Sequence, residues 1–168
     1  MRFLSVVSRA GPWQVAGLVG AGGAIIDQAT KRLAVQALGS GRVVDLPGPF
    51  HFQLTFNAGA AFGIPAPWWL FPAVTVLVLL LVSRSLGRAR GFIEPIAYGL
   101  LVAGALGNIT DRFTRPHPGG VGRGEVVDFI ASTFFPTFNV ADVWINIGFG
   151  LLLVAAYRHE RAERAAES

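Results

Sequence analysis

The stretch FNVADVWINIGFGLLLVAAY, residues 138–157, decides how the rest of the sequence is interpreted. From Val143 onward it is almost wholly apolar, and a helix that crosses a bilayer needs about 20 such residues. Its first turn nevertheless carries Asn139 and Asp142. The stretch therefore predicts a membrane helix that begins with a carboxylate, and the question is which other polar residues reach the same level of the membrane.

The composition of the whole chain agrees with a membrane location. The chain has 168 residues, which suits one domain, and 52% of them are hydrophobic. Only 14% are charged, whereas soluble proteins carry about 25%. The absence of cysteine excludes disulfides, thiolate metal sites and a cysteine nucleophile. We therefore expect an integral membrane protein, with the opening apolar run kept as its first span because it lacks a small-x-small cleavage site.

Four segments are apolar enough to span a bilayer, at about 13–38, 68–83, 92–108 and 139–157. We expect an α-helical integral membrane protein in which residues 1–168 form a single membrane-embedded domain. The connections at about 39–67 and 109–138 join these spans. Arginines flank the other ends of the spans: Arg2, Arg9, Arg84, Arg88, Arg90, Arg158, Arg161 and Arg164. Because positively charged loops stay in the cytoplasm, both termini are predicted to be cytoplasmic and both long connections to face outward.

The outer connections contain strand patterns. Residues 50–57, FHFQLTFN, alternate apolar and polar side chains, which is typical of a strand with one face on an apolar surface. Residues 42–46 are positioned to pair with it across Pro47–Pro49, and residues 125–130 form another β-branched run. We predict a small outward-facing β-sheet on the membrane surface.

This topology brings polar residues from several segments to one depth, near the outer surface. They are Asp27, Lys31, Asn108, Asp111, Arg112, Asp128, Asn139 and Asp142. Charged groups inside a membrane are costly and usually mark a functional site.

Structural explanations exist for most of these residues. Asp27 and Lys31 have the i,i+4 spacing of an intrahelical ion pair. Asn108 is placed to satisfy carbonyls at a helix end, and Asp111 and Arg112 are placed to be interfacial charges.

Asp128 and Asp142 are the candidates for chemistry. Asn139 with Asp142 has the spacing of a helix N-cap, and Asp128 has the alternative of a solvated strand face. Two neighbouring carboxylates can instead share a proton, so that one activates a water and the other polarises a substrate carbonyl. The positive end of the helix favours ionised Asp142. Asp142 is therefore predicted to be the base and Asp128 to hold the proton.

The sequence resembles the lipoprotein signal peptidase (signal peptidase II) family through five motifs in order. They are DQATK (27–31), FNAGAAFG (56–63), GNITDR (107–112), VVDF (126–129) and FNVAD (138–142). Members of this family are membrane aspartyl endopeptidases. They remove the signal peptide from bacterial prolipoproteins, just before a cysteine that carries diacylglycerol.

The resemblance implies roles for particular residues. Asp128 and Asp142 would be the catalytic dyad, and Asn57 and Gly59 would belong to an outer segment that helps hold substrate. A lid would lie near Ala58–Ile64. Residues expected to support the site are Asp27, Lys31, Asn108, Asp111, Arg112 and Asn139.

The resemblance also implies the partners and the location of the protein. The expected partners are a lipid-modified prolipoprotein and membrane lipids, and no nucleic acid is expected. The protein would be a monomer in the bacterial cytoplasmic (inner) membrane, with its active site near the outer face. No cofactor and no metal are expected, because the three histidines are scattered. The connection Phe113–Glu125 is longer than the family pattern, and Glu125 is the rival carboxylate to Asp128.

Two other functions fit parts of the sequence. A small proton-coupled transporter would use the intramembrane acids as a relay, but these acids gather at one face. A scaffold membrane protein would use Asp142 only as a cap and would tolerate Asp128→Asn.

Overall fold

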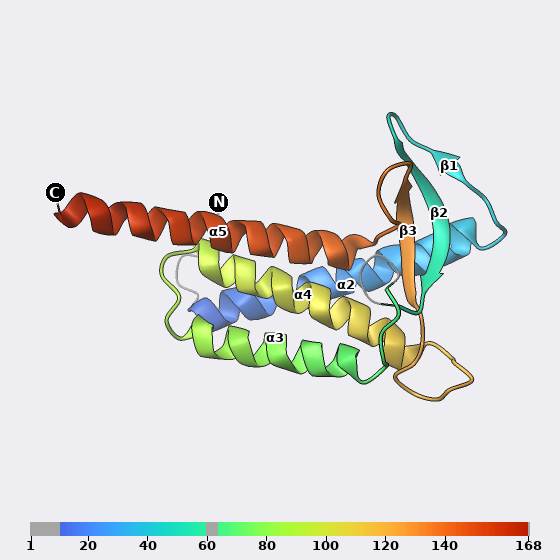
Figure 1. Ribbon diagram of the computed structural model, residues 1–168, viewed down its shortest axis with the longest axis horizontal. Coiled ribbons are helices and arrows are strands. Elements are labelled where there is room, and N and C mark those ends of the chain that lie inside the picture. Colours follow the sequence, from blue (N-terminus) through green and yellow to red (C-terminus); the bar gives the residue numbers. More distant parts are fainter. Residues whose placement is uncertain (1–10, 60–63, 168) are drawn as a thin grey trace, which may run out of the picture.

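The computed structural model describes residues 11–59 and 64–167. Within them, helices and strands follow in the order α2 (Pro12–Leu38), β1 (Val44–Asp45), β2 (Phe50–Asn57), α3 (Leu70–Leu86), α4 (Ile93–Thr114), β3 (Val126–Ser132) and α5 (Val140–Glu167). The helices lie alongside one another, and the sheet stands at one end of the bundle (Figure 1). The opposite end carries the α3–α4 turn and the projecting C-terminal turns of α5.

Small residues allow the helices to approach closely around α4. A Cβ atom added to Gly99 of α4 would lie 2.7 Å from Val19 Cβ of α2, and one added to Gly148 of α5 would lie 2.8 Å from the Ala97 carbonyl oxygen of α4. Close contacts between small residues are typical of helix packing in membranes. Large apolar side chains point away from the bundle, as shown by Leu18, with 72% of its surface exposed.

All four predicted spans correspond to helices, but not all have the length and hydropathy of a span. Among the described residues, α4 and α5 are long and apolar enough to cross a membrane, and α3 is a shorter apolar helix of 17 residues. Helix α5 also continues to Glu167, ten residues beyond the predicted end at Tyr157 (167 − 157 = 10). Hydropathy marks only the apolar part of this helix, whereas its polar turns are supported by an i,i+4 ion pair between Glu160 and Arg164.

The predicted hairpin is present, and β3 extends it into an antiparallel sheet of order β1-β2-β3. Val44 pairs with Phe52 across the turn that contains Gly48, whose φ of 86° lies in the left-handed region. Thr55 of β2 pairs with Asp128 of β3, after a register shift between Phe52 and Thr55.

The sheet rests on the C-terminal end of α2. Its core consists of Ala34 and Leu38 from α2 with Val127 and Phe129 from β3, and Phe52 and Leu54 of β2 pack against it. The alternation predicted for β2 holds only in the middle of the strand, because Phe50 and Phe56 near its ends are exposed. The sheet is thus fixed to the helices through β3, which carries Asp128.

Some predictions fall outside the described residues. Arg2 and Arg9 lie in residues 1–10, and the centre of the predicted lid lies in residues 60–63.

Candidate active site

Asp128 is buried on β3, where its carboxylate accepts two side-chain hydrogen bonds. Only 3% of its surface is exposed, so a solvated strand face is wrong. Asn139 Nδ2 donates to Oδ1 at 2.6 Å, and Asn57 Nδ2 donates to Oδ2 at 3.1 Å. Both oxygens are therefore held in a fixed direction.

Asp142 lies in the first turn of α5 and is fixed from two sides. Asn108 Nδ2 of α4 donates to Oδ1 at 2.9 Å, and the backbone N–H of Asn139 donates to Oδ2 at 3.0 Å. The N–H of Asp142 donates in return to Asn139 Oδ1 at 3.2 Å. The predicted N-cap is confirmed as a reciprocal capping box, but the bond from Asn108 goes beyond capping.

Asn139 connects the two acids. Its side chain is fully buried, and its Nδ2 also donates to Asn108 Oδ1 at 3.1 Å. The same residue thus contacts Asp128 through its side chain and Asp142 through its backbone. The structure brings the two carboxylates together around one asparagine, as the topology predicts.

Burial raises the pKa of Asp128 to about 6. The hydrogen bonds from Asn139 and Asn57 favour the ionised form and lower this pKa, whereas the negative charge of Asp142 raises it. Lys31 lowers it through its positive charge. Desolvation is the dominant effect, so Asp128 retains a proton at a pH at which an exposed aspartate is ionised.

A cluster of buried charged residues lies next to the two acids. Lys31 Nζ is 2.9 Å from Asp27 Oδ2 and 3.2 Å from Asp111 Oδ2, and it donates to Asn108 Oδ1 at 2.9 Å. The predicted ion pair between Asp27 and Lys31 is present, with neither side chain exposed. Because Lys31 also reaches Asn108, the cluster supports the residue that holds Asp142.

The carboxylates of this cluster also fix the backbone around the site. Asp27 Oδ1 accepts the N–H of Ala141 in the first turn of α5 at 2.9 Å. Asp111 Oδ2 accepts the N–H of Val127, next to Asp128, at 3.0 Å. Asp27 and Asp111 thus position the backbone beside each candidate catalytic acid.

Arg112 joins α4 to the segment that follows β2. Its Nη2 donates to the Gly59 carbonyl at 2.7 Å, and its guanidinium lies 3.6 Å from the centre of the Phe71 ring of α3. Asn57 Oδ1 accepts the Gly59 N–H at 2.9 Å. Asp111 and Arg112 are 1% and 6% exposed, so their interpretation as charges at the membrane interface is wrong.

Two contributors were missed by the sequence analysis. Gln28 donates to Asp27, to the Gly107 carbonyl and to Asp111, and its position inside DQATK is a signal that was available. Phe71 gives no such signal, because nothing in an apolar helix marks one phenylalanine as the partner of an arginine.

Other polar residues lie away from the site. His117 is exposed and accepts the Gly119 N–H in a turn. His159 pairs with Glu94 at 3.4 Å in the cytoplasmic half of the predicted topology. Glu125 is half-buried in the connection before β3. Within residues 11–59 and 64–167, no group of histidines and acids is arranged to hold a metal ion.

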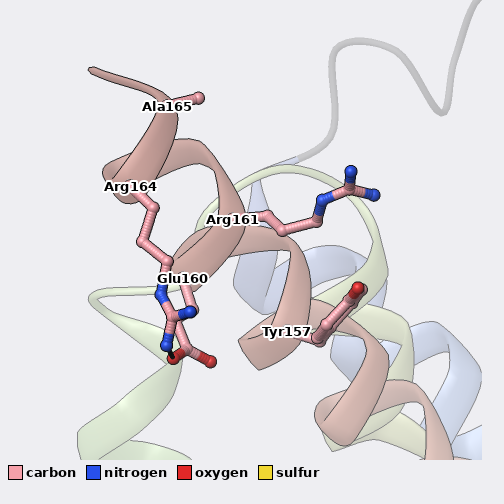
Figure 2. Close-up of a pocket in the computed structure, with 5 residues that line it drawn as sticks. All are labelled: Tyr157, Glu160, Arg161, Arg164 and Ala165. Carbon is pink, nitrogen blue, oxygen red and sulfur yellow. Dashed lines mark hydrogen bonds and ion pairs between the residues drawn. The ribbon is translucent and has the colours of Figure 1, made fainter. Parts of the chain in front are cut away.

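A shallow depression at the far end of α5 is also remote from the two acids. It is lined by Tyr157, Glu160, Arg161, Arg164 and Ala165 (Figure 2). Figure 1 places this end of α5 opposite the sheet. The depression is a feature of one charged helix surface and does not contribute to the candidate active site.

Comparison with known proteins identifies the family. The family model described as Signal peptidase (SPase) II matches residues 19–158. The chain belongs to the signal peptidase II family. All ten predicted site residues, from Asp27 to Asp142, lie inside the matched region.

Individual relatives agree with this assignment. A lipoprotein signal peptidase of Parasynechococcus marenigrum is 38% identical over 168 residues, covering 95% of this chain and 97% of the relative. One from Microcystis aeruginosa is 37% identical over 146 residues, covering 82% of this chain and 88% of the relative. A solved structure of a bacterial membrane enzyme superposes with a TM-score of 0.74 at 30% identity, covering 85% of this chain and 87% of the other. The signal peptidase II fold thus extends over most of the chain, and the chain is a membrane enzyme.

Proposed function

We propose that this protein is an aspartic endopeptidase that removes the signal peptide from diacylglyceryl-modified bacterial prolipoproteins. One observation carries the proposal: two carboxylates, from β3 and α5, are held around the single buried residue Asn139. Membership in the signal peptidase II family supports the reaction and the substrate class.

The proposed reaction uses the two acids in different protonation states. Ionised Asp142 takes a proton from a water, whose oxygen attacks the carbonyl carbon before the lipidated cysteine. Protonated Asp128 donates its proton to the carbonyl oxygen as the tetrahedral intermediate forms. Collapse of the intermediate returns this proton to Asp128, breaks the C–N bond and passes the proton on Asp142 to the leaving amine. Both acids thereby regain their starting states.

The raised pKa of Asp128 supports this assignment of roles. Desolvation favours its protonated form, whereas Asp142 accepts a backbone N–H at the positive end of a helix, an arrangement that stabilises a negative charge. Asn139 and Asn108 would hold the pair in register during the proton transfers.

The supporting residues have separate proposed tasks. Lys31, Asp27 and Asp111 fix α2, α4, β3 and α5 relative to one another, and Asn57 orients Asp128. Arg112 anchors the segment at Gly59, from which the proposed lid begins.

The membrane arrangement is part of the same proposal. Four helices would cross the bacterial inner membrane, with the sheet and the acids at the outer face and both termini in the cytoplasm. The arginines of the α3–α4 turn and of the end of α5 gather opposite the sheet, in agreement with the positive-inside rule (Figure 1). We propose that the protein acts as a monomer. A substrate anchored by its lipid would present its scissile bond at the depth of the acids.

The transporter alternative lacks a comparable observation. In the part of the chain that is described, Asp27, Lys31 and Asp111 form one cluster near the sheet, and Glu94 pairs with His159 far from them. A relay would need ionisable groups along the whole path across the membrane.

The direct test is cleavage of a purified, diacylglyceryl-modified prolipoprotein. We expect the wild type to cut it and the folded variants Asp128→Asn and Asp142→Asn to be inactive. Asp45→Asn, which removes an exposed carboxylate on β1, is the matched control and should retain activity. Cleavage by either dyad variant would refute the catalytic assignment, and failure of the wild type to cleave would refute the proposed function.

A further inference from the structure

Asn146 is a polar residue on the apolar part of α5, one turn after Asp142. Its side chain is exposed, and its Nδ2 donates to the carbonyl oxygen of Asp142 at 2.8 Å. Across residues 11–59 and 64–167 this side chain forms no other hydrogen bond. This leaves its amide oxygen and one N–H without a protein partner. In the membrane arrangement proposed above, an unpaired amide on this part of α5 is costly.

The packing of α5 shows which side Asn146 occupies. Gly148 lies against Ala97 and Leu100 of α4, and Trp144 Nε1 donates to the Gly23 carbonyl of α2 at 3.1 Å. Residues at i and i+4 share one face of a helix, so Asn146 lies on the face that begins with Asp142. This face is turned away from the contact with α2.

Below Asn146, the same face is apolar. Phe149 and Leu153 continue it at helical spacing and are 59% and 58% exposed. The face therefore leads from one candidate catalytic acid, past a single amide, to an exposed hydrophobic surface. An apolar segment that lies along it with its cleavage site at Asp142 would pass Asn146.

We infer that Asn146 binds the backbone of the signal segment, its amide oxygen accepting an N–H from a residue shortly before the bond that is cut. The inference rests on the proposed function and names a positioning residue for that reaction. An N–H donor distinguishes the peptide from the diacylglyceryl group, whose ester oxygens only accept hydrogen bonds.

The spacing along α5 predicts which substrate residue is bound. Four residues of α-helix advance about 6 Å, at about 1.5 Å per residue. An extended peptide advances about 3.3 Å per residue. The N–H that reaches Asn146 therefore belongs to about the second residue before the scissile bond.

A kinetic comparison tests the inference with the full-length enzyme and a diacylglyceryl-modified peptide substrate. We expect Asn146→Leu, which keeps the size but removes the amide, to raise KM about five- to tenfold with little change in kcat, because a bond kept throughout the reaction contributes equally to substrate and transition state. Ile147→Leu, at the next and also exposed position, is the matched control and should leave KM unchanged. A purely structural role through the Asp142 carbonyl would instead lower kcat.

The decisive experiment changes the substrate in place of the enzyme. Replacing the amide that carries the predicted N–H by an ester removes the donor, and should lower kcat/KM about five- to tenfold for the wild type but have little effect on Asn146→Leu. Equal losses in both enzymes would overturn the inference. Moving the ester along the signal segment with the wild type alone gives a second test, and a flat response would also overturn it.

Failure of this inference can be distinguished from failure of the proposed function. One outcome is that Asp128→Asn and Asp142→Asn are inactive while the ester lowers kcat/KM equally for the wild type and Asn146→Leu. In that case only the role of Asn146 is wrong. If either dyad variant still cuts, the proposed catalytic function is wrong.

Discussion

The buried carboxyl group of Asp128 makes the stability of the folded protein depend on pH, and Asp128→Asn should remove that dependence. Burial raises the pKa of Asp128 to about 6, from 3.8 for an exposed aspartate. Below pH 3.8 the group is protonated in both the folded and the unfolded chain. As the pH rises toward 6, the unfolded chain gains the more favourable ionised form first, so the folded state loses stability. The total loss is about 3 kcal/mol.

In Asp128→Asn the loss of folding stability at this position is the same at every pH, because an asparagine side chain does not titrate. Its amide offers one oxygen where the carboxylate offers two, so one of the donors on Asn57 and Asn139 faces another N–H group. An unsatisfied buried donor costs about 1–3 kcal/mol. We therefore expect Asp128→Asn to have a lower free energy of unfolding than the wild type near pH 4. Between pH 4 and pH 8 the free energy of unfolding of the variant, relative to that of the wild type, should rise by about 3 kcal/mol.

Thermal unfolding in detergent at a series of pH values measures this shift. At about 2–4 °C per kcal/mol, the difference in Tm between variant and wild type should change by about 6–12 °C across this pH range. Asp45→Asn, which removes an exposed carboxylate, should follow the wild type throughout. Parallel curves for the wild type and Asp128→Asn would show that Asp128 is not desolvated in the folded protein and would refute the reasoning.

Three further predictions follow from the same site. Because the proposed reaction needs a proton on Asp128, whose pKa is raised to about 6, kcat/KM should fall about tenfold per pH unit above about pH 6, and a flat profile up to about pH 9 would contradict this. Asn139→Ala removes the 2.6 Å donor to Asp128 and should lower kcat by about 100-fold in single-turnover assays; a variant with wild-type kcat would exclude Asn139 as the connection between the acids. Gly107→Ala would place a Cβ atom 2.5 Å from Asp27 Oδ2 and should lower the free energy of unfolding by about 2–4 kcal/mol in denaturation experiments, whereas Gly22→Ala, with nothing within 4 Å, is the control and should be neutral or stabilising. Equal effects of the two alanine substitutions would mean that Asp27 can move without cost.

Local spacing made part of the site predictable. The i,i+4 pair of Asp27 and Lys31 and the capping box of Asn139 and Asp142 depend only on helix geometry, and both are present. The hairpin turn was predictable because Pro47–Pro49 separates two strand-like runs. Features of this kind need no knowledge of how distant elements pack.

The contacts between distant elements were not predictable in detail. Asp111 accepts the N–H of Val127 because α4 is rotated to face β3, and neither the rotation nor the depth of a helix follows from its hydropathy. Asn57 was expected to help hold substrate, yet its side chain reaches Asp128. That contact depends on the register shift between Phe52 and Thr55, which the alternation of β2 does not reveal.

The hydrogen bond between Asp27 and Ala141 has a consequence for biosynthesis. A ribosome makes Asp27 of α2 early and Ala141 of α5 near the end, 114 positions later along the chain. Membrane helices associate after each has inserted, so the final helix must dock against an already assembled α2 and α4 before this bond forms. Until then Asp128 also lacks its donor from Asn139. The proposed catalytic site is therefore incomplete in a nascent chain, and we expect enzyme activity to appear in one step when synthesis and insertion of α5 are complete.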